Sequence, residues 1–310
     1  MKLLALGDVH LMSRTPSSRV DDIVETEFGK LQFVLDMAVQ RGCWAVLQPG
    51  DLFDQPRVSY QILRRCINML KASGRSMLGV LGQHDVSFHS VETFGKAAVG
   101  VMEAAEFWVL LSDKPYSLPD GVSIYGAHYG QQVPEPVNAE AFNILVVHAS
   151  IGSQPLFPGH DLTLPEDFLR RHPKYGLVIC GDYHYSFDVE LGKRRIINAG
   201  CLLRKTASLR DLEHVPKVAI VSCGKEMELE IEWIAVKHLP VEEVFKSDVL
   251  ENREGGGEDK KALGNLIGKL RSGISVRSSF KDSLLAYFIG NGTDSEVRQA
   301  IMEELERRGL

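Results

Sequence analysis

Side chains that bind metals fall in five short clusters along the first 184 residues. Each cluster offers carboxylate, imidazole or amide groups, and the five are, in order, Asp8-x-His10, Gly50-Asp51-Leu52-Phe53-Asp54, Gly82-Gln83-His84-Asp85, His148 and Gly181-Asp182-Tyr183-His184. This mixture of ligands suits manganese, iron or zinc better than calcium or magnesium. One such cluster alone is more often structural, but five in succession favour a metal site.

The segments before these clusters are predicted to be strands. Residues 1 to about 200 alternate short apolar runs with helical patterns, which is typical of a layered α/β domain with a largely parallel or mixed sheet. Because the carboxyl ends of such strands converge on one crevice, we expect the five clusters to meet in space. Gly50 and Gly82 allow the tight turns that direct the side chains.

The rest of the chain has a different pattern. From about residue 185, consecutive apolar runs predict further strands, the later ones antiparallel. We therefore divide the chain into a core (1–205), strands that complete the core or form a small capping region (206–245), and a charged, glycine-rich linker with C-terminal helices (246–310). These helices either fold back on their own domain or bind another chain.

Composition limits the classes of function. The net charge of −6 argues against binding nucleic acid through bulk basic charge alone. The five cysteines are scattered and form no C-x-x-C pair, which indicates reduced thiols in a cytoplasmic protein. No apolar run is long enough for a membrane span, and no signal peptide is recognised.

The series of clusters resembles the motifs of the calcineurin-like metallophosphoesterases, D-x-H, G-D-x-x-D, G-N-H-[DE], H and G-H-x-H. The matching residues are Asp8, His10, Asp51, Asp54, His84, Asp85, His148 and His184. The resemblance implies a first metal ion held by Asp8, His10, Asp51 and His184. Asp51 would bridge to a second ion, held also by Gln83, His148 and Asp182. We expect two divalent cations, manganese first, with iron, zinc or magnesium as alternatives.

Two residues depart from this pattern at the second ion. Gln83 stands where the family has asparagine, and Asp182 stands where it has histidine. Both still offer oxygen ligands, so we expect a working second site that binds its ion differently from the first.

The expected reaction is hydrolysis of a phosphodiester. Two cations a few ångströms apart can bind the ester's oxygens and lower the pKa of the attacking water. His84, next to a proposed ligand, is expected to stabilise the transition state or protonate the leaving oxygen, with Asp85 or Asp54 orienting it. The alternative is that His84 only supports the ligands structurally.

A finer resemblance suggests the substrate. Asp8-Val9-His10-Leu11, Arg19 and the G-D-L-F-D motif look like the nuclease subunit of the SbcCD complex and its phage relatives, although Ala199 and Cys201 depart from that group's N-P-G-S. The resemblance implies a DNA exo/endonuclease in DNA repair, recombination or phage DNA processing. It also implies an SMC-like (SbcC-type) ATPase bound by the C-terminal helices, and dimers are common in that group.

Other readings stay open at the level of sequence. The core could act on a nucleotide, a phosphoprotein or another small phosphoester, or it could be a non-catalytic scaffold. Three arginines are weak candidates for contacts with substrate phosphates, because short basic pairs are usually solvated surface. These are Arg194, Arg195 and Arg204.

Overall fold

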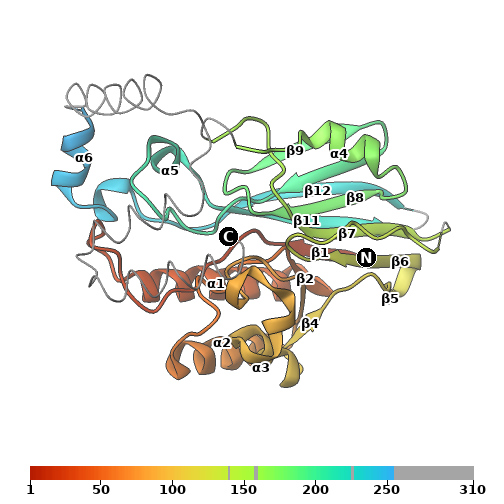
Figure 1. The fold of residues 1–310 in the computed structure, drawn as a ribbon, viewed down its shortest axis with the longest axis horizontal. Helices are drawn as coiled ribbons and strands as arrows, with labels where there is room; N and C mark the ends of the chain where they lie inside the picture. Colours follow the sequence, from red (N-terminus) through yellow and green to blue (C-terminus); the bar gives the residue numbers. More distant parts are fainter. Residues whose placement is uncertain (139, 157–159, 225–226, 255–310) are drawn as a thin grey trace, which may run out of the picture. The chain divides into compact units, whose positions relative to one another are not determined.

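Two six-stranded sheets pack face to face within residues 1–250 (Figure 1). The computed structural model describes residues 1–254 apart from 139, 157–159 and 225–226. The first sheet has the order β12 (Met227–Ala235), β11 (Lys217–Gly224), β1 (Lys2–Ala5), β2 (Ala45–Gln48), β3 (Ser76–Gly79), β4 (Trp108–Leu110). The second has the order β5 (Tyr116–Leu118), β6 (Val122–Ala127), β7 (Phe142–His148), β8 (Leu177–Gly181), β10 (Arg194–Asn198), β9 (Phe187–Leu191). The α/β class predicted from the sequence is confirmed, with the strands divided between two mixed sheets.

The apolar runs of the central strands follow from burial on both faces. One face of each sheet contributes to a shared core, in which Leu3, Leu47 and Ile144 have no exposed surface. The opposite faces are covered by helices, so these strands are apolar along their whole length and do not alternate apolar with polar residues. β6 is buried along its whole length.

Helices cover the outer faces of both sheets. In Figure 1, α1 (Ile23–Gln40), α2 (Tyr60–Ser73) and α3 (Ala98–Ala104) lie along the first sheet, and α4 (Pro165–Arg171) lies on the second. The side chain of Asp22 caps α1 by accepting from the backbone N–H groups of Val24 and Glu25. Within the described residues no helix is both long and apolar enough to cross a membrane.

The region after residue 205 adds to the first sheet. β11 pairs antiparallel with β1, and β12 pairs antiparallel with β11. Residues 209–213 form a short helix, α5 (Leu209–Glu213). The predicted linker begins instead with a helix, α6 (Ser247–Glu254), because Val249 and Leu250 pack against the buried Phe245. The rest of that linker and the predicted C-terminal helices lie in residues 255–310, outside the described residues.

Two buried ionisable residues on α1 bind the loops that follow β1 and β10. Glu27 Oε2 accepts from the Met12 N–H at 2.8 Å, and Lys30 Nζ donates to the Leu202 carbonyl at 2.8 Å. Glu27 Oε1 is buried without a hydrogen-bond partner. Burial raises the pKa of Glu27 to about 8 and lowers that of Lys30 to about 8.

Replacing Glu27 by glutamine is expected to make the protein more stable at pH 8. Above its ordinary value of 4.5, an unfolded Glu27 loses a proton that the folded chain keeps, so its contribution lowers the free energy of unfolding as pH rises towards 8. Glu27→Gln retains the acceptor for Met12 and should add about 2 kcal/mol at pH 8 but little at pH 5. Urea unfolding at the two pH values measures this, and an equal effect at both would contradict it.

Candidate metal centre

The five clusters meet at one end of the two sheets. The first three follow β1, β2 and β3 of the first sheet, and the last two lie at the ends of β7 and β8 of the second. Backbone hydrogen bonds hold the loops together, with the N–H groups of Val9 and His10 donating to the Asp51 carbonyl at 3.1 and 2.9 Å. Asp182 N–H donates to Asp8 Oδ2 at 3.1 Å and so links the two sheets.

The ligand loops carry strained backbone. His10, Asp51 and Asp182 have φ values of 52°, 54° and 81°, in the left-handed region that residues other than glycine rarely adopt. Each costs about 1 kcal/mol or more, and such strain gathers at functional sites. Gly82 is needed for close approach, because a Cβ there would lie 2.0 Å from Asp51 Oδ1.

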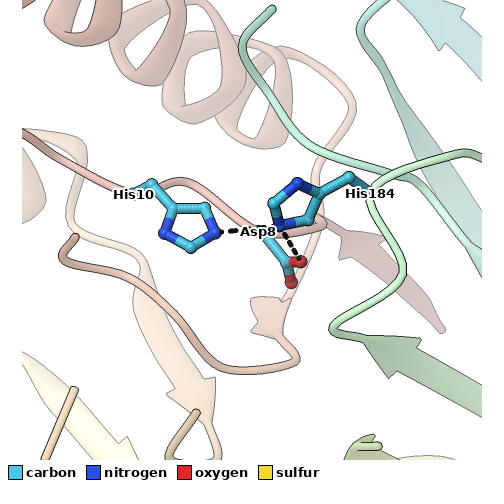
Figure 2. Close-up of side chains that lie close together, drawn as sticks. All are labelled: Asp8, His10 and His184. Carbon is cyan, nitrogen blue, oxygen red and sulfur yellow. Dashed lines mark hydrogen bonds and ion pairs between the residues drawn. The ribbon is translucent and has the colours of Figure 1, made fainter. Parts of the chain in front are cut away.

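Asp8, His10 and His184 form the first group of ligand atoms (Figure 2). Their rings and carboxylate converge, with His184 Nε2 lying 3.1 Å from His10 Nε2 and 3.6 Å from Asp8 Oδ2. Burial lowers the pKa of His10 well below its usual value and that of His184 to about 4. Both imidazoles are therefore neutral at pH 7, which is the state that binds a metal.

Asp51 lies between the two groups. Its Oδ1 accepts from the His84 N–H at 2.9 Å, whereas Oδ2 is buried and has no hydrogen-bond partner. That free oxygen lies 3.6 Å from His10 Nε2 and 3.6 Å from His148 Nε2. An unpaired buried carboxylate oxygen is costly unless a cation satisfies it, so these residues fit a bridging metal ligand.

His148 is the centre of the second group. Its Nδ1 lies 2.6 Å from the Pro49 carbonyl, which leaves Nε2 to face Gln83 Oε1 at 2.7 Å and Asp182 Oδ1 at 3.9 Å. Burial acts to lower the pKa of His148, but Asp51, Asp8 and Asp182 outweigh it and raise that pKa. The negative charge that causes this rise would also attract a cation.

The two departures from the family pattern contact each other. Gln83 Nε2 donates to Asp182 Oδ1 at 2.8 Å, and its Oε1 faces His148. Glutamine is longer than asparagine and aspartate is shorter than histidine, so the amide spans the space that a larger residue at 182 would fill.

We therefore expect the two departures to act as a compensated pair. Gln83→Asn alone and Asp182→His alone should each weaken binding of the second Mn²⁺ by about tenfold, because each leaves a partner unpaired. The double variant should bind the second Mn²⁺ more tightly than the sum of the two single-variant losses predicts. Calorimetric titration of all four proteins with Mn²⁺ measures this, and additive effects would mean that the residues act independently.

His84 is held beside the first group by backbone groups. Its Nδ1 lies 3.0 Å from the Asp54 carbonyl, and its ring stands edge-on to that of His10 with centroids 5.0 Å apart. The predicted orienting role thus falls to the main chain of Asp54. Asp85 instead accepts from the N–H groups of Asp51, Phe53 and Gly82, and burial raises its pKa to about 7.

The Asp54 carboxylate binds a lysine that the motifs did not single out. Lys205 Nζ donates to Asp54 Oδ1 at 2.8 Å, and the same oxygen lies 3.4 Å from His10 Nδ1. Burial acts to raise the pKa of Asp54, but His10 and Lys205 hold it well below its usual range. In the sequence, Lys205 was only the neighbour of Arg204, and nothing local predicted its link to Asp54.

The three candidate arginines each contact other groups of the chain. Arg204 is buried and donates to the carbonyls of His214 and Leu239 at 2.9 and 2.8 Å. Arg194 donates to the Leu169 carbonyl, and Arg195 is ion-paired with Asp188. Arg194 and Arg195 also begin β10, which runs parallel to β8, so they lie at the opposite end of the sheet from the ligand loops. Contact of the three arginines with substrate stays a prediction, and for Arg194 and Arg195 it would be made away from the ligand loops.

Known proteins resemble the chain over part of its length. No protein-family model matches it. The DNA double-strand break repair protein Mre11 of Methanosarcina mazei is 25% identical over 243 residues, which are 73% of this chain and 37% of that protein. The Mre11 protein of Aeropyrum pernix is 32% identical over 109 residues, 34% of this chain and 25% of that protein. The chain thus spans well under half the length of these relatives.

Solved structures also match. The crystal structure of TT1561 of Thermus thermophilus aligns with a TM-score of 0.48 and 12% identity, covering 76% of this chain and 99% of that one. A dimetal phosphatase from Danio rerio aligns with a TM-score of 0.47 and 12% identity, over 76% and 99%.

The two mixed sheets flanked by helices, with candidate metal ligands at the strand ends, form an α/β fold with the arrangement that the metallophosphoesterase motifs predict. The layered α/β class expected from the sequence is confirmed. The chain resembles calcineurin-like metallophosphoesterases of the Mre11/SbcD type, and its similarity to the Mre11 proteins is distant.

Proposed function

We propose that the protein is a metal-dependent phosphodiesterase that cleaves DNA. The observation that carries the proposal is the free Oδ2 of Asp51, which faces one imidazole from each ligand group. A carboxylate placed in this way is suited to hold two divalent cations at a short distance, and we favour manganese for the mixed nitrogen and oxygen ligands.

His84 and Asp85 have separate roles in the proposed reaction. Bound at the two groups, divalent cations would polarise the phosphate and activate the attacking water. The Asp54 carbonyl accepts from His84 Nδ1, so Nε2 is left to face the substrate, and in the imidazolium form it can donate its proton to the leaving oxygen or bind the phosphate. Asp85 holds three backbone N–H groups of the ligand loops and so keeps Asp51 in place.

DNA is favoured as substrate by the sequence relatives, both of which are named DNA double-strand break repair proteins. The net charge of −6 fits an enzyme that shares DNA binding with another protein. We therefore propose an SMC-like ATPase as partner, bound through residues 255–310.

Purified protein with Mn²⁺ should hydrolyse bis-p-nitrophenyl phosphate and shorten end-labelled DNA. Cleavage of the small ester with intact DNA, even when a candidate ATPase is added, would favour a small-phosphoester enzyme instead. Cleavage of neither, with at most one ion per chain by elemental analysis, would favour a scaffold.

The partner is tested by truncation after Glu254. This keeps the contact of Phe245 with Arg19 and the hydrogen bond from the Lys246 N–H to the Ser18 carbonyl. Small-ester hydrolysis should be retained while co-elution with the ATPase on a sizing column is lost. Unchanged co-elution would place the ATPase contact elsewhere on the chain.

A further inference from the structure

Phe88 is the most exposed large apolar side chain among the described residues, at 95%. It lies four positions after His84, on the loop that carries the third ligand cluster. Phe88 and His89 both adopt left-handed backbone, with φ values of 55° and 54°. Two such residues in succession cost about 1–3 kcal/mol each, so the surrounding loop must impose the conformation.

Thr93 supplies that constraint. Its Oγ1 accepts from the Ser87 N–H at 2.9 Å and lies 2.8 Å from the Ser90 carbonyl. The Ser90 N–H in turn donates to the Ser87 carbonyl at 3.1 Å, which closes the loop. Val86, just before it, is buried and anchors the loop to the core. The exposed ring of Phe88 is therefore presented by a fixed backbone.

An aromatic row connects this loop with the second ligand group. The rings of His89 and Tyr129 stand edge-on with centroids 6.0 Å apart, and those of Tyr129 and His148 stand edge-on at 6.2 Å. Tyr129 is held by its N–H, which donates to the Leu81 carbonyl at 2.9 Å. Phe88 precedes His89 in the chain, and Tyr129 joins His89 to the candidate ligand His148, so we call Phe88, His89 and Tyr129 the aromatic row.

We propose that the aromatic row stacks nucleobases of an unpaired DNA strand whose phosphate lies at the metal centre. This rests on the proposed function and names its preferred substrate, a single-stranded end. Every base has a flat π face, so aromatic side chains bind single strands with little regard to sequence. Bases inside a duplex are already stacked and paired, and they offer no free face to Phe88.

The aromatic character of Phe88 is tested by Phe88→Leu, which keeps an apolar side chain and removes the ring. The matched control is Trp44→Leu, a partly exposed aromatic just before β2, at the opposite end of the sheet from the ligand loops. With Mn²⁺ and a single-stranded oligonucleotide, Phe88→Leu should lower kcat/KM about tenfold, mainly through KM. Blunt duplex cleavage, small-ester hydrolysis and the control should be unchanged, and Phe88→Trp should retain wild-type kinetics.

The tryptophan of Phe88→Trp also reports stacking directly, since its fluorescence should be quenched by the oligonucleotide. Equal kinetics of Phe88→Leu and wild type on single strands, or absence of quenching, would overturn this inference while leaving the nuclease proposal intact. A wild type that hydrolyses the small ester but no DNA would remove both. A Phe88→Leu variant that changes only subunit or ATPase association would identify a protein contact and overturn the inference.

Discussion

Asp51→Asn is expected to lower turnover of bis-p-nitrophenyl phosphate on the order of a thousandfold or more and to reduce bound metal to at most one ion per chain. Each divalent ion contributes several kcal/mol to such a reaction, and Asp51 Oδ2 lies 3.6 Å from Nε2 of both His10 and His148. Asparagine tolerates left-handed backbone, so the loop geometry at φ 54° should persist. Steady-state kinetics and elemental analysis measure the two effects.

The same change should stabilise the metal-free protein. Asp51 is one of the charges that raise the pKa of Asp8 and Asp85, after burial itself, so its removal relieves repulsion inside the core. We expect a higher Tm than wild type in EDTA and a smaller gain when Mn²⁺ is added. The exposed Asp36→Asn is the control and should change neither value. A lower Tm in EDTA would mean that Asp51 stabilises the fold without metal.

His84→Gln is expected to lower turnover by about 10²–10⁴-fold while metal content stays at the wild-type level. The hydrogen bond from residue 84 to a candidate ligand is donated by its backbone N–H to Asp51 Oδ1, and any side chain at this position keeps it. The Tm gain on adding Mn²⁺ should therefore match wild type. The control is His238→Gln, where the Nδ1 of the histidine lies 2.8 Å from the Val236 carbonyl. Loss of metal together with activity would make His84 a structural support of the site.

The meeting of the candidate ligands could be predicted because it depends on local sequence signals. Each ligand follows a short apolar strand, and a strand's carboxyl end fixes where the next residue can lie. Asp8, Asp51 and His148 therefore come together in the way that their strand positions predict.

What the sequence could not provide depends on contacts between distant segments. The division of strands between two sheets is set by which apolar faces meet, and apolar runs look alike in both sheets. The sequence named Arg204 as a weak candidate for contact with substrate and could not show its burial, because its acceptors are the backbone carbonyls of His214 and Leu239, which no side-chain pattern indicates. The hydrogen bond between Gln83 and Asp182 joins residues 99 positions apart, so neither substitution alone indicated the other.

Each ligand group draws side chains from both sheets. Asp8 and His10 from the first sheet meet His184 from the second, and Gln83 from the first meets His148 from the second. Bound ions would thus act as cross-links that close the sandwich at one end. If the sheets separate in the rate-limiting step of unfolding, metal would slow unfolding more than it speeds folding. Removing the metal with a chelator would then stop catalysis and also shorten the time for which the protein stays folded.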